Sequence, residues 1–177
     1  MRRFLIVVGL VIVFFLIYFL QVNVFGTFTI AGIKPNLFVI YVLFIGLFAN
    51  HILGISFGVI IGLLLDFLYG KTIGVTATML CVIGYLAAYF DKNFSKENKL
   101  TIILMVAGAT VIFEFGTYLL NSFFLEFDAE YLYFTKIVLI EVLYNVLLSI
   151  ILYPLIQKVG YSIDRNFKKN NILTRYF

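Results

Sequence analysis

The feature that most constrains this chain is a regular series of small residues in an apolar stretch between positions 54 and 74. Every fourth residue is glycine, except at Asp66: Gly54, Gly58, Gly62, Gly70 and Gly74. Residues four apart stack on one helix face, so these glycines predict a groove without side chains. In water each glycine costs a helix about 1 kcal/mol relative to alanine, whereas in a bilayer glycines let helix backbones approach closely. The stretch therefore predicts a packed intramembrane helix.

The composition supports a membrane location for the whole chain. Of its 177 residues, 63% are hydrophobic and 12% are charged, and the mean hydropathy is +1.10. A soluble domain is closer to half apolar and a quarter charged. We therefore expect an all-α, polytopic membrane protein with a single transmembrane domain. The lone cysteine, Cys81, excludes an internal disulfide and a cysteine-rich metal site.

The apolar runs predict a six-helix transmembrane bundle, since one span needs roughly 20 residues. The expected spans cover about 4–24, 35–50, 52–70, 72–90, 100–121 and 134–157, followed by a basic cytoplasmic tail, 158–177. The first run lacks a small-x-small cleavage site, so we expect a retained span. The charge-free run 35–65 is too long for one span and short for two, which favours two short helices. Pro35 is expected in the first turn of the second helix.

The basic residues predict the orientation of the bundle. Six spans with an internal N-terminus put 10 of the 13 basic residues in the cytoplasm: Arg2, Arg3, Lys92, Lys96, Lys99, Lys158, Arg165, Lys168, Lys169 and Arg175. The outer loops keep Lys34, Lys71 and Lys136. By the positive-inside rule both termini are expected in the cytoplasm. The net charge of +4 then follows from topology and predicts no nucleic-acid partner.

Two segments outside the spans each allow two interpretations. The outer loop 122–134 mixes aromatic and acidic residues, which fits a segment lying on the outer leaflet or a plain solvated turn. The tail from Lys158 has Ile163 and Phe167 four apart beside basic residues. It fits a helix on the anionic inner leaflet or a disordered tail.

Three carboxylates lie inside expected spans: Asp66, Glu114 and Glu141. Each costs about 2.5–3.5 kcal/mol near the bilayer centre unless it is paired or protonated. Counting 1.5 Å per residue, all three come out about 20 Å above the cytoplasmic boundary. We therefore expect one intramembrane polar cluster that also includes Asn145. Its function is either a polar pocket or partner site, or a set of hydrogen bonds that holds the bundle together.

Small and polar residues mark further helix faces. Ser149 continues the stripe of Glu141 and Asn145, and a second stripe contains Thr110, Glu114, Thr117, Tyr118 and Asn121. A seam of small residues runs through Gly74, Ala77, Cys81, Gly84 and Ala88 and predicts close packing. No P-loop, dinucleotide fingerprint, zinc motif or nucleophile–base set is present, and His51 is the only histidine. We expect no catalytic residues, no cofactor and no metal, although a membrane enzyme with other chemistry stays open.

The chain resembles the MreD family of rod shape-determining proteins. The resemblance rests on Lys34-Pro35-Asn36-Leu37, which opens the second expected helix, and on Gly58-x3-Gly62-x3-Asp66-x7-Gly74. The six-span frame and the short basic ends add to it. Many relatives carry an aspartate after the proline, at the position of Asn36.

The resemblance implies a non-enzymatic component of the bacterial lateral wall-elongation machinery, in the cytoplasmic membrane. That family works with the bitopic protein MreC, the filament MreB, RodA and its transpeptidase; a homodimer is left open. It also implies a fold similar to the S components of energy-coupling-factor vitamin transporters. A transporter subunit is therefore the alternative function. Those subunits carry an Ala-x-x-x-Ala pair on their first helix, which the bulky run 4–18 lacks.

Overall fold

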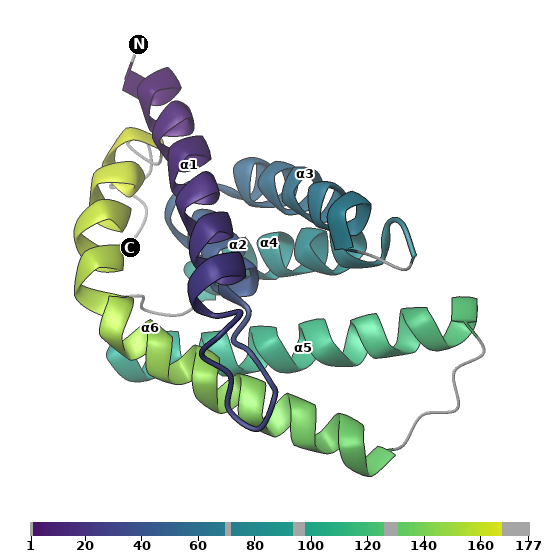
Figure 1. Ribbon diagram of the computed structural model, residues 1–177. Helices are drawn as coiled ribbons and strands as arrows, with labels where there is room; N and C mark the ends of the chain where they lie inside the picture. Colours follow the sequence, from purple (N-terminus) through teal and green to yellow (C-terminus); the bar gives the residue numbers. More distant parts are fainter. Residues whose placement is uncertain (1, 70–71, 94–97, 126–130, 168–177) are drawn as a thin grey trace.

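The computed structural model describes residues 2–69, 72–93, 98–125 and 131–167. Within these ranges the chain forms six α-helices and no β-strand longer than an isolated bridge. The helices are α1 (Arg2–Phe19), α2 (Leu37–Phe48), α3 (His51–Tyr69), α4 (Val75–Asn93), α5 (Lys99–Leu125) and α6 (Tyr131–Phe167) (Figure 1). A short π-helix, η1 (Leu20–Val24), prolongs α1. The prediction of an all-α bundle is confirmed.

Four of these helical segments are long and apolar enough to cross a membrane: Arg3–Val24, His51–Tyr69, Lys99–Phe123 and Leu132–Phe167. Two further apolar helical segments, Leu37–Phe48 and Val75–Asp91, are shorter. A chain with several such helices is a polytopic membrane protein.

The short helix α2 is the centre of the bundle. All 12 of its residues are buried, because apolar side chains occupy every face and leave no polar side to expose. At 1.5 Å per residue it is only about 18 Å long, well short of the roughly 30 Å of a bilayer core. The run 35–65 thus divides into a short central helix and a full-length one.

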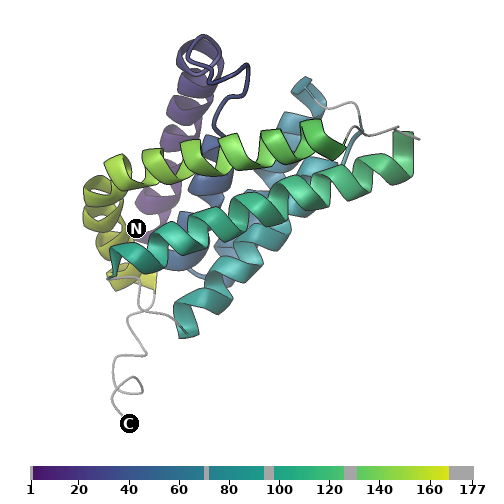
Figure 2. The same ribbon diagram turned by 90° about the horizontal axis from the view of Figure 1, so that it is seen from below.

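Two helical hairpins pack around α2. Helices α3 and α4 form one hairpin and α5 and α6 form the other, and α2 contacts all four. Helices α5 and α6 contact each other and run in similar directions in Figure 2, and they spread apart toward the end of α5 and the start of α6 in Figure 1. Helix α1 lies on the outside of this assembly and contacts α6 (Figure 1). Only 17% of the membrane-length segment that contains α1 is buried, so most of its apolar surface faces outward.

Glycines bring α3 and α4 into backbone contact. A Cβ atom built on Gly54 would lie 2.8 Å from the Gly84 carbonyl oxygen. Similar atoms on Gly58 and Gly62 would collide with the backbone at Leu80 and Ala77. No side chain fits at any of these places, because the backbone cannot move aside as a flexible side chain would. Close backbone packing of this kind is how small residues join helices in a bilayer.

The last two glycines of the series do not share this contact. Gly74 has φ +99° and nothing within 4 Å of its added Cβ, so the structure corrects its expected place in the groove. It occupies the turn before α4, where a positive φ favours glycine. Gly70 lies outside the described residues.

Helix α6 is longer than the last expected span. It continues past residue 157 to Phe167 and contains Pro154, near which it bends (Figure 1), as helices do where proline removes a hydrogen bond. Ile163 and Phe167 pack against the hydrophobic core, which explains why the segment is an ordered helix; residues 168–177 lie outside the described ranges. In the expected outer loop, α5 runs on to Leu125 and α6 starts at Tyr131.

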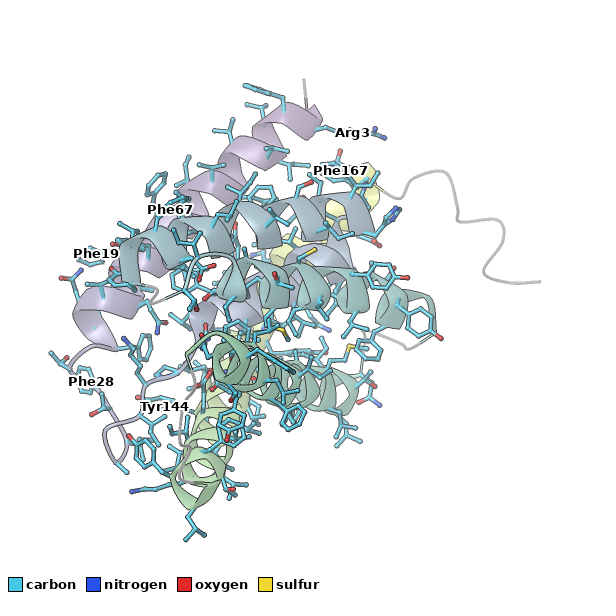
Figure 3. The ribbon with its side chains drawn as sticks, turned by 90° about the vertical axis from the view of Figure 1, so that its right-hand side faces the viewer. Arg3, Phe19, Phe28, Phe67, Tyr144 and Phe167 are labelled. Carbon is cyan, nitrogen blue, oxygen red and sulfur yellow. The ribbon has the colours of Figure 1, made fainter. Side chains whose placement is uncertain are left out.

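The N-terminal end of α1 contacts the C-terminal end of α6. The Arg3 Nε donates to the Asn166 carbonyl at 3.3 Å, and its guanidinium lies 5.7 Å from the centre of the Phe167 ring. Figure 3 shows Arg3 and Phe167 close together at one end of the molecule. The start of α1 and the end of α6 are therefore on the same side of the bundle.

Candidate functional site

The buried aspartate of α3 holds the start of α4. The Asp66 side chain is 2% exposed. Its carboxylate accepts from the backbone N–H groups of Gly74 at 2.8 Å, Thr76 at 3.2 Å and Ala77 at 3.1 Å. These N–H groups have no partner within the helix, and the helix N-terminus favours a negative charge. Asp66 therefore caps α4 from a neighbouring helix, which compensates for burying its charge.

This contact changes the expected polar cluster. Within the described ranges, the Asp66 carboxylate bonds to the backbone at the start of α4 and not to Glu114 or Glu141. Sequence spacing placed the three carboxylates at one depth, but Asp66 has a separate set of partners. The remaining members, Glu114, Glu141 and Asn145, gather near the start of α2.

Gln21 of the π-helix is hydrogen-bonded to the segment that leads into α2. The Gln21 Nε2 donates to the Pro35 carbonyl at 2.6 Å, and its Oε1 accepts from the Leu37 N–H at 3.2 Å. The Gln21 side chain is buried. Its amide thus joins the end of α1 to the start of α2 with both of its polar ends.

Asn145 of α6 is hydrogen-bonded to the same segment. The Asn36 N–H donates to Asn145 Oδ1 at 2.8 Å, and Asn145 Nδ2 donates to Thr110 Oγ1 of α5 at 3.0 Å. Asn145 and Thr110 are fully buried. Asn36 is the N-cap of α2, with Oδ1 accepting from the Val39 N–H at 3.4 Å. Pro35 therefore precedes the cap, which corrects its expected place in the first turn.

The two glutamates complete this cluster. Glu114 of α5 and Glu141 of α6 are neighbours that interact with each other, and Glu141 also interacts with Asn36. The Oε1 atom of Glu141 is buried without a hydrogen-bond partner. We name Gln21, Asn36, Thr110, Glu114, Glu141 and Asn145 the α2-entry cluster.

Sequence reasoning missed Gln21 and did not place Lys34 near the polar cluster, using it only for topology and for the motif that opens the second helix. A neutral amide near the end of an apolar helix is a signal that could have identified Gln21, because an amide in hydrocarbon needs partners. Within the described part of the chain, no group of three or more His, Cys, Asp and Glu residues could hold a metal ion. Gln21, Asn36, Thr110 and Asn145 bind one another and the backbone through their side chains.

Comparison with known proteins identifies the family. The family model described as rod shape-determining protein MreD matches residues 2–160 of the 177 residues. A search of curated proteins and a search of solved structures found no match. The family match covers every described helix except the final turns of α6. The chain therefore belongs to the MreD family of rod shape-determining proteins.

Proposed function

We propose that this chain is a non-enzymatic membrane component of the bacterial rod-shape complex, in which it binds MreC. Through MreC it helps to assemble the filament MreB, the synthase RodA and its transpeptidase for lateral wall growth. The observation that carries the proposal is the family match over residues 2–160. The expected location is the bacterial cytoplasmic membrane.

The contacts of the buried polar residues support a scaffold role. The Asp66 carboxylate is hydrogen-bonded to the N-terminus of α4, and both ends of the Asn145 amide are hydrogen-bonded, to Asn36 and Thr110. A catalytic group needs access to a reacting atom, whereas these groups are occupied by the fold. Their arrangement fits a rigid platform for other membrane proteins.

The meeting of α1 and α6 supports an orientation with both termini in the cytoplasm. Arg3 contacts Asn166 and Phe167, so the two ends of the bundle lie at one side, as an even number of crossings requires. The bias of basic residues toward that side gives the direction.

Affinity capture in detergent tests the proposed partner. The tagged full chain is coexpressed with MreC or, separately, with the coupling module of an energy-coupling-factor transporter. We expect MreC to be captured and the coupling module to be absent. A genuine S component serves as the control bait and should give the reverse result. Capture of the coupling module without MreC would replace our proposal by the transporter alternative.

A further inference from the structure

A cavity of about 360 Å³ opens beside the α2-entry cluster. Its wall includes Gln21 of η1, Lys34 and Asn36 before α2, Tyr69 of α3, Thr76 of α4 and Glu141 of α6. Small-molecule sites have volumes of roughly 300–1,000 Å³, mostly apolar walls and a few polar groups. This cavity has both kinds of wall, and with Phe113 of α5 six separate segments of the chain contribute to it.

One buried oxygen of a residue that lines the cavity lacks a hydrogen-bond partner. Glu141 is 7% exposed, and its Oε1 atom has no hydrogen-bond partner. The great majority of buried polar atoms in folded proteins have one, so an orphaned oxygen calls for an unseen donor. Glu141 lines the cavity, and the donor can therefore come from an occupant. A primary ammonium group offers three donors and a positive charge.

Lys34 brings the opposite charge to the same wall. Its side chain is exposed, lines the cavity and lies near enough to interact electrostatically with Glu141. The cavity thus presents an anion-binding lysine and a buried carboxyl group. An occupant that satisfies both carries an anionic group and an ammonium group on one short frame.

Apolar surface leads to the cavity from outside the bundle. The wall residues Val22 and Tyr69 are exposed, and so are Phe19 and Phe67 nearby in the chain. Figure 3 shows Phe19 and Phe67 on the same side of the molecule. The Tyr18 and Tyr69 hydroxyls are 2.6 Å apart and join α1 to α3 beside the cavity. An occupant with acyl chains would find apolar surface for them here.

We propose that this cavity binds a zwitterion in which a primary ammonium is joined to a phosphate or carboxylate group. The ammonium donates to Glu141 Oε1 and the anion pairs with Lys34. Two sources share this chemistry: the headgroup of an aminophospholipid and a free solute such as phosphoethanolamine. The site is independent of MreC binding, so its test does not depend on the proposed function.

Native mass spectrometry of the full chain in detergent measures this binding. The probes are phosphatidylethanolamine, phosphatidylglycerol and phosphatidylcholine at equal concentration, and phosphoethanolamine alone. We expect one phosphatidylethanolamine to be retained in preference to the other two lipids, because phosphatidylglycerol has no ammonium and the trimethylated ammonium of phosphatidylcholine cannot donate. Binding of phosphoethanolamine without phosphatidylethanolamine would also support the zwitterion and would identify a soluble source.

Three variants connect the binding to the named residues. Glu141→Gln and Lys34→Gln should each weaken binding by at least about 10-fold. Lys34→Gln removes the positive charge that pairs with the anion, and Glu141→Gln replaces one of two carboxyl oxygens by an NH2 group that repels the ammonium. Lys136→Gln, at an exposed position outside the cavity wall, should bind as the wild type does. Should Glu141→Gln fail to fold, the exposed Lys34→Gln variant decides alone. Equal retention of all three lipids, or unchanged binding by Lys34→Gln, would overturn the proposal.

Discussion

Asp66 accepts three backbone N–H bonds from the start of α4, so its carboxylate has a structural task that an amide can perform only in part. Asp66→Asn keeps one acceptor oxygen and directs an NH2 group at backbone donors. We expect it to lower the free energy of unfolding by about 1–3 kcal/mol. Asp66→Ala, which keeps no acceptor, should be worse. Melting temperatures in detergent should fall from the wild type to Asp66→Asn to Asp66→Ala. Equal melting temperatures for all three proteins would contradict the capping role.

Gln21 gives a second test at the scale of one side chain. Gln21→Glu still accepts from the Leu37 N–H but turns a carboxylate oxygen toward the Pro35 carbonyl, to which Gln21 now donates. We expect a loss of about 1–3 kcal/mol in stability from this unmade bond. Asn23→Asp is the matched control, because Asn23 is on the same π-helix and exposed. Equal melting temperatures for the two variants would mean that the hydrogen bonds from Gln21 to the segment before α2 do not stabilise the protein.

Sequence spacing predicts which face and depth a polar residue occupies, but not the neighbour that it meets. Asp66, Glu114 and Glu141 all come out at similar depth in apolar helices, yet Asp66 bonds to the backbone at the start of α4 while the two glutamates are neighbours of each other. The neighbour depends on how helices are arranged around α2, and hydropathy carries no record of that arrangement. Asn145 was predicted as polar, but its bond to the Asn36 N–H needed the structure.

At the scale of helices, the contact between α3 and α4 depends on the absence of side chains. Gly58→Ala would drive a methyl group into the Leu80 backbone, and we expect overpacking to cost about 1–3 kcal/mol. Gly108→Ala on α5 is the matched control, because nothing lies within 4 Å of its added Cβ. It should be neutral or more stable by up to about 1 kcal/mol. The comparison uses melting in detergent, and equal losses for both variants would remove the packing explanation.

The glycine series predicted this helix pair well because the repeat of four residues is itself the contact. Gly54, Gly58 and Gly62 meet α4 where small residues such as Ala77 and Gly84 recur. The prediction was wrong at the end of the series, because Gly74 lies in a turn with positive φ and not in the groove. A sequence repeat cannot show where a helix ends, and α3 ends at Tyr69.

For the whole molecule, both termini are predicted on the cytoplasmic side. Reporter fusions after Arg175 and within 92–99 should both report cytoplasm, because basic residues concentrate there and α1 meets the end of α6. A reporter inserted between the end of α5 and the start of α6 is the control and should report the outer side. An external reporter after Arg175 would require an odd number of crossings and would contradict the orientation.

Most of the architecture follows from hydropathy alone, since apolar runs in a bilayer have little choice but to be helical. The all-α bundle and the order of its helices were predictable in this way. The central position of α2 was less so, although its 12 buried residues lack a polar face. The cavity beside Glu141 was not predictable, because it is formed by segments that the chain folding brings together.

The enclosure of α2 has a consequence for how the protein is made. Helix α1 precedes α2 and contacts it, since the Tyr41 hydroxyl donates to the Leu10 carbonyl. The other four helices packed on α2, which are α3, α4, α5 and α6, all follow it in the chain. A nascent chain therefore inserts its most apolar helix well before the last of these neighbours is synthesised. Until α6 emerges, Asn145 is missing and the Asn36 N–H has no such acceptor. Chains cut short before α6 therefore carry an unfinished core, in which the start of α2 lacks one of its hydrogen-bond partners.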